Sequence, residues 1–456
     1  MTTLGRRSAS LLFAGDLVAL SASLYVTLAL RYLTWPTSAM LAPYWVPFAF
    51  LFALWLLVFY GAGLYGKQFM LFPSRLPDAL VKTQAANILF AAVFFFLVPV
   101  FGIAPKTILV LYLVVSLALV LVWRLALYPK LSARPKRERV ILVAEGEEAD
   151  ELYREVNGNA RYGIEFCCRP SGDALASADA FHAAIEGQGA ALIVADTTSE
   201  RVARIMQHIY ELTRVEHAYQ FASFEDMYEE VFDRIPLSQL GHVWFLEHVS
   251  ATESLFYGVI KRLIDIVGGI AMGVVTLIAI PFVFAANLFE GGGALFIAQD
   301  RFGRYGERIV CYKFRSMRQN KSASSEWTTE EKKDNPITKV GAVLRKTSLD
   351  EFPQFVNILK GEISLIGPRN DILGLGHRLA EALPYYEARY LVTPGITGWA
   401  QINQRYEPGN AAPQSIEETK VRLAYDFYYL KHRSLGLDLV IALKTVKRMF
   451  FRVSSW

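Results

Sequence analysis

The sequence predicts a membrane protein of mixed architecture: an N-terminal four-helix transmembrane bundle, a Rossmann-like α/β middle domain and a C-terminal α+β domain. Three observations support this fold class. Hydrophobic residues make up 53% of the 456 residues, a high share for a soluble protein. Four apolar runs, each about long enough to cross a bilayer, open the chain. Strand-like and helix-like segments then alternate, and a fifth apolar run precedes a more polar C-terminal part.

The N-terminal apolar runs predict a transmembrane bundle within residues 1–130. They cover roughly 10–34, 44–65, 84–104 and 107–128. Lys and Arg are concentrated before the first run, between the second and third, and after the fourth. Because basic links face the cytoplasm, both ends of the bundle should be cytoplasmic. Asp16 and Arg31 lie inside or near the first run, where they could line a polar site or pack between helices.

Residues 131–255 predict a small Rossmann-like domain. Two apolar segments, 139–144 and 190–195, have the composition of buried parallel strands, and helical segments lie between or after them. The turn after the first strand, residues 144–149, contains one glycine and three acids instead of G-x-G-x-x-G. These acids would repel a pyrophosphate. We therefore predict no nucleotide site here, and instead a scaffold or dimerisation role that would make the protein a homodimer.

The fifth apolar run, residues 263–289, allows two membrane topologies. It follows Lys261 and Arg262, and Pro281 interrupts it. Its spacing alone slightly favours an ordinary fifth span with a proline kink, which would place all later residues outside the cytoplasm. The alternative is a segment that enters the membrane, breaks near Pro281 and leaves on the same side. Irregular backbone at that depth is acceptable only where protein or polar neighbours cover it.

The stretch 347–370 holds the candidate chemistry. Asp350 and Glu351 precede Pro353, a residue that the first turn of a helix tolerates. We expect a short helix from about Ser348 or Asp350 to a C-terminal cap at Gly361. The positive end of this helix and nearby bases should favour the ionised carboxylate of Asp350.

Basic residues surround the acid pair in the sequence: Lys313, Arg315, Arg345 and Arg369. Arginine can fork two phosphate oxygens, and helix starts bind phosphate. Two acids among bases therefore suggest metal-assisted phosphoryl chemistry. A capped helix with a solvated charge cluster is an equally good interpretation of this stretch alone.

The remaining C-terminal segments predict ordinary elements. Residues 293–318 predict a hairpin around the turn 302–306, and residues 319–336 predict a polar loop. Residues 416–432 predict a helix rich in tyrosine. Residues 437–453 predict an amphipathic helix suited to a membrane surface, or else packed on the core.

Four segments in this order resemble the bacterial sugar transferase family: Lys313-Phe-Arg-Ser-Met, Leu349-Asp-Glu-Phe-Pro-Gln-Phe, Ser364-Leu-Ile-Gly-Pro-Arg and Pro394-Gly-Ile-Thr-Gly-Trp-Ala-Gln. These are the monotopic polyprenyl-phosphate phosphoglycosyl transferases. The resemblance covers residues 256–456, and the N-terminal bundle with a Rossmann-like domain is similar to the family's large subclass. It implies that 256–456 is the catalytic domain and that 263–289 is a re-entrant helix broken at Pro281, which reverses the ranking of the two topologies.

The resemblance also implies a reaction. The enzyme would transfer a sugar-1-phosphate from a nucleoside diphosphate sugar to polyprenyl (undecaprenyl) phosphate. The donor in this family is usually a UDP-sugar, and the transfer starts polysaccharide or glycan assembly. The catalytic domain would face the cytoplasm at the bacterial inner membrane. Asp350 would be the nucleophile and Glu351 would hold Mg²⁺. The resemblance implies that Lys313, Arg315 and Arg369 bind phosphate, and we add Arg345, which precedes the acid pair in the sequence.

Two departures and two alternatives accompany this resemblance. Asn370 follows Gly-Pro-Arg where the family usually has proline, and Ile280 precedes the break-point proline where a small polar residue is frequent. A membrane-anchored nucleotide-sugar dehydratase would need Tyr-x-x-x-Lys, a spacing that Tyr257 and Lys261 have, but also a glycine-rich turn. A lipid flippase or assembly scaffold would not need the acid pair. No nucleic-acid partner is expected.

Overall fold

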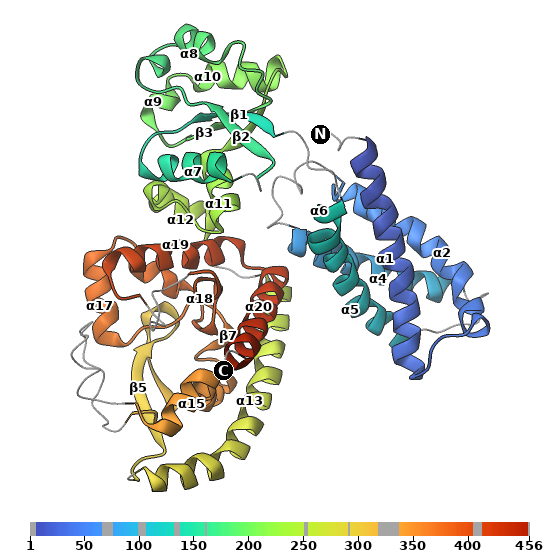
Figure 1. Ribbon diagram of the computed structural model, residues 1–456, viewed down its shortest axis with the longest axis vertical. Helices are drawn as coiled ribbons and strands as arrows, with labels where there is room; N and C mark the ends of the chain where they lie inside the picture. Colours follow the sequence, from blue (N-terminus) through green and yellow to red (C-terminus); the bar gives the residue numbers. More distant parts are fainter. Residues whose placement is uncertain are drawn as a thin grey trace. The chain divides into compact units, whose positions relative to one another are not determined.

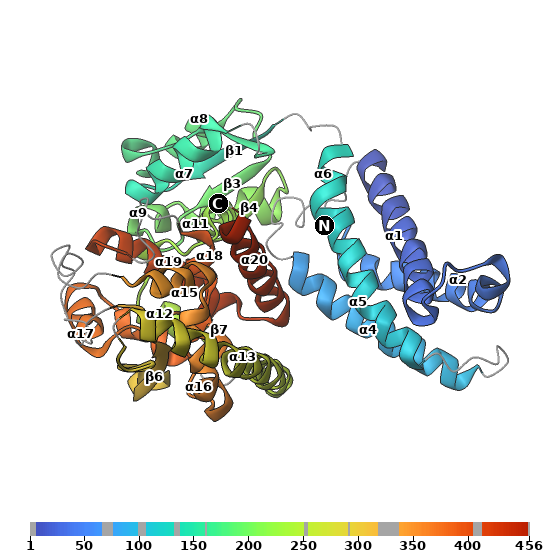
Figure 2. The ribbon, with the colours of Figure 1, turned by 60° about the horizontal axis from the view of Figure 1, so that its bottom comes forward.

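The protein divides into two units, Met1–Val231 and Phe232–Trp456 (Figures 1 and 2). The computed structural model describes residues 6–65, 76–98, 106–131, 137–159, 162–249, 254–290, 292–317, 337–404 and 413–454. The predicted polar loop at 319–336 lies outside these residues. Because the division falls at Val231, residues 232–249 group with the C-terminal unit, although the sequence placed them with the middle domain.

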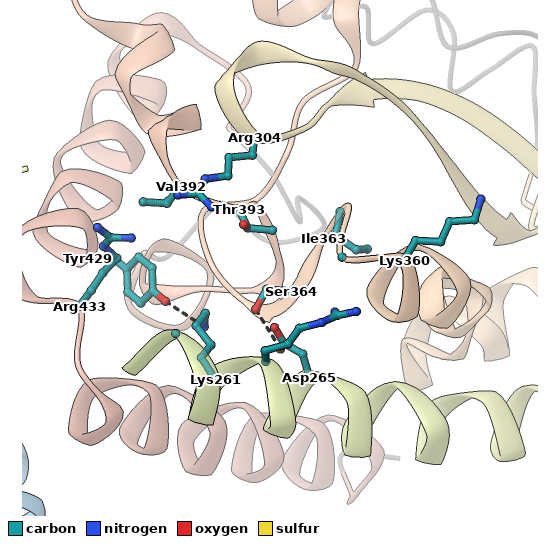
Figure 3. Close-up of a pocket in the computed structure, with 13 residues that line it drawn as sticks. Lys261, Asp265, Arg304, Lys360, Ile363, Ser364, Val392, Thr393, Tyr429 and Arg433 are labelled. Atoms are coloured by element: carbon teal, nitrogen blue, oxygen red, sulfur yellow. Dashed lines mark hydrogen bonds between the residues drawn. The ribbon is translucent and has the colours of Figure 1, made fainter. Parts of the chain in front are cut away.

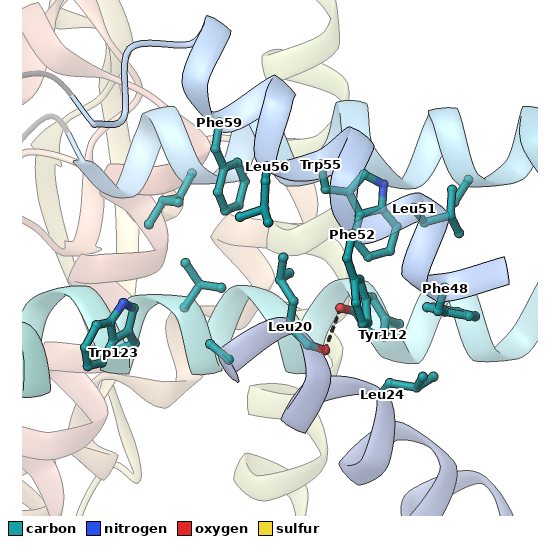
Figure 4. Packing of buried hydrophobic residues seen from close by; sticks show 14 of the residues in the cluster. Leu20, Leu24, Phe48, Leu51, Phe52, Trp55, Leu56, Phe59, Tyr112 and Trp123 are labelled. Atoms are coloured by element: carbon teal, nitrogen blue, oxygen red, sulfur yellow. Dashed lines mark hydrogen bonds between the residues drawn. The ribbon is translucent and has the colours of Figure 1, made fainter. Parts of the chain in front are cut away.

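Four long helices in the first unit share one hydrophobic core. They are α1 (Arg6–Tyr32), α2 (Ser38–Gly61), α4 (Leu76–Leu97) and α5 (Lys106–Val122). The aromatic rings of Phe48, Trp55 and Tyr112 are fully buried at the centre of this core (Figure 4). The hydroxyl of Tyr112 donates to the carbonyl of Leu20, 2.9 Å away, so that α5 is tied to α1.

Asp16 is buried between these helices. Its carboxylate accepts from Arg124 Nε at 3.0 Å and from the Tyr65 hydroxyl at 2.8 Å. Arg124 lies in the π-helical turn Trp123–Leu127, which continues α5 into α6 (Tyr128–Leu131). The structure therefore supports the helix-packing interpretation of Asp16, because a charge inside an apolar bundle needs a partner.

Five helices in the described part of the chain are long and apolar enough to cross a membrane. They include residues Ser10–Tyr32, Ser38–Gly61, Ala79–Phe96 and Thr107–Leu131, and the helix α13 (Leu255–Phe289). Their mean hydropathy lies between 1.6 and 2.6. These helices together with the α/β sheet below are consistent with the predicted membrane protein.

The second part of the first unit is a parallel α/β domain. Its strands are β1 (Glu138–Val143), β2 (Ile164–Cys168), β3 (Leu192–Ala195) and β4 (Gln220–Ser223), in the spatial order β2-β1-β3-β4. The longer helices are α7 (Glu147–Gly158), α8 (Ala178–Ile185), α10 (Met206–Tyr210) and α11 (Phe224–Phe232), and they lie on both faces of the sheet (Figure 1). This confirms the predicted α/β architecture.

The acidic turn after β1 is satisfied within the domain. Glu145 accepts from Arg201 at 2.9 Å and from the backbone N–H of Gly172 at 3.4 Å. The Glu145 carboxylate thus occupies the Arg201 guanidinium and the Gly172 N–H, which are donors that a pyrophosphate would need. The absence of a dinucleotide site stays a prediction, as does the homodimer.

The second unit contains two small sheets and a set of helices. Strands β5 (Phe296–Phe302) and β6 (Arg308–Phe314) form the hairpin that the sequence predicts. Phe302 pairs with Arg308 next to the short turn, and Phe296 pairs with Phe314 at the open end. Strand β7 (Ser364–Ile366) lies parallel to β8 (Gly395–Thr397). The helices are α15 (Lys339–Thr347), α16 (Phe355–Lys360), α17 (Leu373–Ala382), α18 (Trp399–Asn403), α19 (Ile416–His432) and α20 (Leu435–Ser454).

Residues before α13 pack on the same unit. The backbone N–H of Ile235 donates to the carbonyl of Ala424 in α19 at 3.1 Å. The indole N–H of Trp399 donates to the carbonyl of Asp233 at 2.7 Å. Helix α12 (His242–His248) adds Trp244 to the hydrophobic core around Phe427. The C-terminal unit thus begins before the helix that the sequence takes as its start.

Helix α13 is attached to this unit at both ends. Near its start, Lys261 Nζ contacts Asp438 of α20 at 3.1 Å. Just after its end, Glu290 accepts from the backbone N–H of Lys339 at the start of α15, at 2.8 Å. Side chains of β7 and α16 lie against its central glycines, Gly268, Gly269 and Gly273. The last turns bend away from the rest of the helix (Figure 1), near Pro281, which has no N–H for the helical ladder.

Candidate active site

The acid pair lies on a tight turn between two helices. Helix α15 ends at Thr347, and Ser348 takes a left-handed conformation with φ of 59°. A 3₁₀ helix, η8 (Leu349–Gln354), carries Asp350 and Glu351 in its first turn. Pro353 cannot donate to the carbonyl of Leu349, so the α-helical pattern begins only at Phe355. The predicted cap is confirmed at Gly361, where φ is 88°.

Glu351 is held by two cations. Lys313 Nζ, at the end of β6, lies 2.6 Å from Glu351 Oε1, and Arg369 Nη1 lies 3.1 Å from Oε2. A second nitrogen of Arg369 also contacts Oε1, which makes the arginine bidentate. Burial opposes the charge, but Arg369 and Lys313 outweigh it and hold the pKa of Glu351 well below its usual range. Burial lowers the pKa of Lys313 to about 8, against the attraction of Glu351.

Asp350 differs from its neighbour. Among the residues that the structure describes, no side chain hydrogen-bonds or ion-pairs with its carboxylate. Burial and the charge of Glu351 raise the pKa of Asp350, and Lys313, Arg345 and Arg369 only partly offset them. The prediction that the helix start and bases favour the ionised form is therefore wrong in direction. Burial of the carboxylate is the largest cause, and two of the three cations, Lys313 and Arg369, are already paired with Glu351.

The other two predicted phosphate-binding residues are placed differently. Arg345 Nε donates to Ser316 Oγ at 2.9 Å, and its charge still acts on Asp350. Arg315 instead binds Asn287 and the carbonyl of Gly292, at the end of α13. The spacing of Lys313 and Arg315 suggests a common strand face, but β6 ends at Phe314. The structure therefore brings together Lys313, Arg345 and Arg369 around the acids, and not Arg315.

Arg369 owes its position to a crossing of two loops. Gly367 donates to the carbonyl of Thr397 at 2.9 Å, and Gly395 donates to the carbonyl of Pro368 at 2.9 Å. A Cβ atom on Gly395 would come within 2.1 Å of the backbone nitrogen of Gly367. Only glycine permits so close a backbone approach. The glycines of the two motifs thus serve to bring Arg369 beside Glu351.

A buried polar network supports the Arg369 loop, and the sequence analysis missed it. Arg389 and Arg422 donate to the carbonyl of Arg369 at 2.7 and 2.6 Å. Asp371 accepts from Arg422 at 3.0 Å and also binds Arg389. Burial opposes ionisation of Asp371, but the two arginines outweigh it and lower its pKa. The pattern Arg422-x-x-x-Asp426, one helical turn apart, was the available signal.

Asn370 contributes a further contact to this loop. Arg301 Nη1 donates to its backbone carbonyl at 2.8 Å and to its side-chain Oδ1 at 3.1 Å. A proline at this position would keep the first bond and lose the second. The departure from the family pattern therefore ties the loop to β5 through a side-chain hydrogen bond.

The side chains around the acid pair could hold a divalent cation only if phosphate oxygens of a substrate supplied further ligands. Within the described residues, no group of three or more His, Cys, Asp or Glu side chains could hold a metal ion. Both oxygens of Glu351 contact Lys313 or Arg369, whereas no described side chain occupies the oxygens of Asp350. Mg²⁺ commonly takes one or two carboxylates and completes its shell with water and substrate phosphates. The site fits that arrangement, with Asp350 as the more accessible ligand.

Comparisons with known proteins match the part of the chain that carries this site. A family model described as bacterial sugar transferase matches residues 256–452. The exopolysaccharide production protein PSS of Rhizobium leguminosarum is 34% identical, over 41% of this chain and 94% of that protein. The UDP-N-acetylgalactosamine-undecaprenyl-phosphate N-acetylgalactosaminephosphotransferase of Aeromonas hydrophila is 36% identical over 47% of each chain. The UDP-glucose:undecaprenyl-phosphate glucose-1-phosphate transferase of Escherichia coli K12 is 35% identical over 38% of this chain and 36% of that protein.

The α+β unit, its apolar helix and its carboxylate–cation cluster define a membrane-associated enzyme class that handles phosphate. Because this chain covers nearly all of the Rhizobium protein at 34% identity, it belongs to the bacterial sugar transferase family. Its matches span about half the length of the Aeromonas relative and less of the Escherichia coli one.

Proposed function

We propose that the protein transfers a sugar-1-phosphate from a UDP-sugar to polyprenyl phosphate, and so starts polysaccharide assembly. The names of the relatives from Aeromonas and Escherichia coli describe such transfers to undecaprenyl phosphate. The Rhizobium relative is named for exopolysaccharide production. The observation that carries the proposal is a difference between the two acids: within the described residues, two cations bind Glu351 and none binds Asp350.

This difference supports Asp350 as the nucleophile. The Glu351 carboxylate is a weak nucleophile because Lys313 and Arg369 bind its oxygens. It is also needed to hold those two side chains in place. Asp350 has oxygens available, is half-buried, and has a raised pKa, which marks a more basic carboxylate. Carboxylates of this kind form covalent intermediates in phosphoryl transfer. Asp350 is therefore the residue that attacks phosphorus.

The reaction then has two steps. An oxygen of Asp350 attacks the sugar-linked phosphorus, and the bond to the bridging oxygen breaks, so that uridine monophosphate leaves with the electron pair. The phosphosugar is now an acyl phosphate on Asp350. An oxygen of polyprenyl phosphate attacks the same phosphorus, and Asp350 leaves as a carboxylate. The product is a polyprenyl diphosphate sugar.

The cations stabilise the charge that builds up on the transferring phosphate. Arg369 and Lys313 sit on Glu351, so each can shift one donor toward a phosphate oxygen without leaving the site. Arg345 lies on the Asp350 side. A bound Mg²⁺ would neutralise diphosphate oxygens and stabilise the departing nucleotide. Glu351, the predicted Mg²⁺ ligand, has the more direct role of aligning Arg369 and Lys313.

The contacts of α13 support a re-entrant topology. A perpendicular span would carry its two ends to opposite sides of the bilayer, yet α13 contacts one unit at Lys261, along its glycines and at Glu290. Its opposite face exposes apolar side chains, among them Phe282 at 71% and Phe289 at 92%. A helix buried on one face and apolar on the other suits one membrane leaflet. We place the C-terminal unit on the cytoplasmic face of the inner membrane, where nucleotide sugars are available.

The dehydratase alternative loses its support. Tyr257 and Lys261 both contact Asp438, at 3.0 and 3.1 Å, and lie in the unit without the Rossmann-like sheet. Their side chains are thus committed to joining α13 to α20.

The proposal is tested with purified protein, undecaprenyl phosphate and a panel of UDP-sugars. Release of uridine monophosphate should depend on one or few sugars, and a lipid-linked sugar diphosphate should form in equal amount. Asp300→Asn, which removes an exposed acid paired with Arg308, should behave as wild type. If no UDP-sugar yields a lipid-linked product under conditions where the protein is folded, the proposed reaction is wrong.

A further inference from the structure

A second polar cavity lies in the C-terminal unit, beside the first half of α13. It has a volume of about 280 Å³. Figure 3 shows Lys261 and Asp265 extending from α13 on one side, with Arg304 and Thr393 across from them. Roughly 300 to 1,000 Å³ is usual for sites that enclose a drug-sized molecule. This cavity is therefore sized for a small polar group and not for a nucleotide sugar.

Its lining is strongly cationic. Five basic residues contribute: Lys261, Arg262, Arg304, Lys360 and Arg433. The acid in the wall, Asp265, is buried and accepts from Ser364 Oγ and from the backbone N–H of Leu365, each at 2.9 Å. Two further acids lie beside the wall: Asp438 contacts Lys261, and Glu362 contacts Lys360. Three acids thus stand against five basic residues. The cavity thus favours an anion.

Two of the cations are already used to build the walls. Lys261 Nζ donates to the carbonyl of Ile366 at 2.9 Å, and Arg262 donates to the carbonyl of Ile358 at 2.7 Å. Lys360 is different, since its side chain is 56% exposed and its ion pair with Glu362 is long, at 3.9 Å. Lys360 and Arg304, which lies on the hairpin turn, can therefore be changed without removing these wall contacts.

The cavity adjoins a surface that faces apolar surroundings. Along the same turns, α13 exposes the side chains of Phe256, Val259 and Leu263, at 68%, 65% and 56%. When this surface enters a bilayer, a cationic cavity within a turn of it would lie where the hydrocarbon gives way to headgroups. Basic side chains at that level attract anionic lipids.

The geometry points to a binding site for the phosphate headgroup of an anionic bilayer phospholipid, formed by Arg304, Lys360 and the cationic wall on α13. None of the residues that line it belongs to the cluster of Lys313, Asp350, Glu351 and Arg369. We therefore treat this site as separate from that of the polyprenyl acceptor at Asp350. The inference needs only that α13 contacts a membrane, and it stands apart from the proposed reaction.

The test is native mass spectrometry of the full-length protein in detergent, with phosphatidylglycerol and phosphatidylcholine added in equal amounts. Wild type should retain one phosphatidylglycerol in preference to phosphatidylcholine. Arg304→Gln/Lys360→Gln should weaken phosphatidylglycerol binding about 25-fold, at roughly fivefold for each cation, or about 2 kcal/mol in all. The matched control is Arg308→Gln/Lys420→Gln, which removes two charges from exposed ion pairs elsewhere in the unit and should bind as wild type.

Two further arms identify the source of the phosphate. Millimolar inorganic phosphate should not displace the phospholipid, because it lacks the acyl chains that contact α13. Undecaprenyl phosphate at equal concentration should bind without displacing it. Equal loss of binding in both double variants, no preference for the anionic lipid in wild type, or displacement by undecaprenyl phosphate would each overturn the assignment.

Discussion

Replacing the two neighbouring acids should have opposite consequences for stability. Glu351→Gln removes the charge that Lys313 and Arg369 share, in a site where the Glu351 side chain is only 13% exposed. Two cations then remain close together without their anion. Breaking a buried ion pair from one side typically costs about 3–5 kcal/mol.

Asp350→Asn should cost little or nothing. The folded pKa of Asp350 is raised above its unfolded value, so the ionised form is less favourable in the folded protein than in the unfolded chain. This penalty is absent at low pH and fully present at neutral pH. Removing the charge at pH 7 relieves it. We therefore expect an unfolding temperature equal to or slightly above that of wild type.

Thermal unfolding of the purified proteins in one detergent, followed by intrinsic fluorescence, measures this difference. For a unit of this size, about 3–5 kcal/mol lowers Tm by roughly 6–20 °C. Asp300→Asn is the control, because it breaks an exposed pair with Arg308 worth under about 1 kcal/mol. If Asp350→Asn lowers Tm as much as Glu351→Gln, the two acids are equivalent structural partners and the argument for their separate roles fails.

Three other outcomes follow. On the acid side, kcat/KM should fall with an apparent pKa above that of ordinary aspartate, because Asp350 must ionise. On the alkaline side it should fall near pH 8, because Lys313 loses its proton. Activity that stays constant from pH 6 to 9 would contradict the assigned Lys313 contact. In intact cells of a cysteine-free background, an impermeant maleimide should label Thr37→Cys but not Ala382→Cys, and labelling of both would mean that α13 crosses the membrane. Gly395→Ala should abolish turnover and lower stability by at least about 2 kcal/mol, since its Cβ would lie 2.1 Å from a backbone nitrogen; near-normal activity would show that the loop crossing does not position Arg369.

Local patterns in the sequence identified much of the fold. Alternating apolar residues and a glycine-rich turn were enough for the hairpin β5–β6, and Gly361 was enough for the end of α16. The parallel strands of the middle domain were equally clear from their apolar composition. These features depend on neighbours in the chain, which a sequence displays directly.

Features that depend on tertiary contacts were missed or misplaced. Arg315 contacts Asn287 at the end of α13, and only the folded chain shows that these two residues meet. The pKa of Asp350 moved opposite to expectation because burial, followed by the charge of Glu351, outweighs the nearby cations. Arg389 and Arg422 support the Arg369 loop from distant segments, and only the folded chain shows that they meet.

The proposed covalent role of Asp350 is the centre of this account. It is tested most directly by intact-protein mass spectrometry after mixing the enzyme with its UDP-sugar in the absence of polyprenyl phosphate. Wild type should gain the mass of one phosphosugar, peptide mapping should place it on Asp350, and uridine monophosphate should appear in matching amount. Asp350→Asn should gain no mass and turn over no substrate. An adduct on another residue, or turnover by Asp350→Asn at the wild-type rate, would contradict the account.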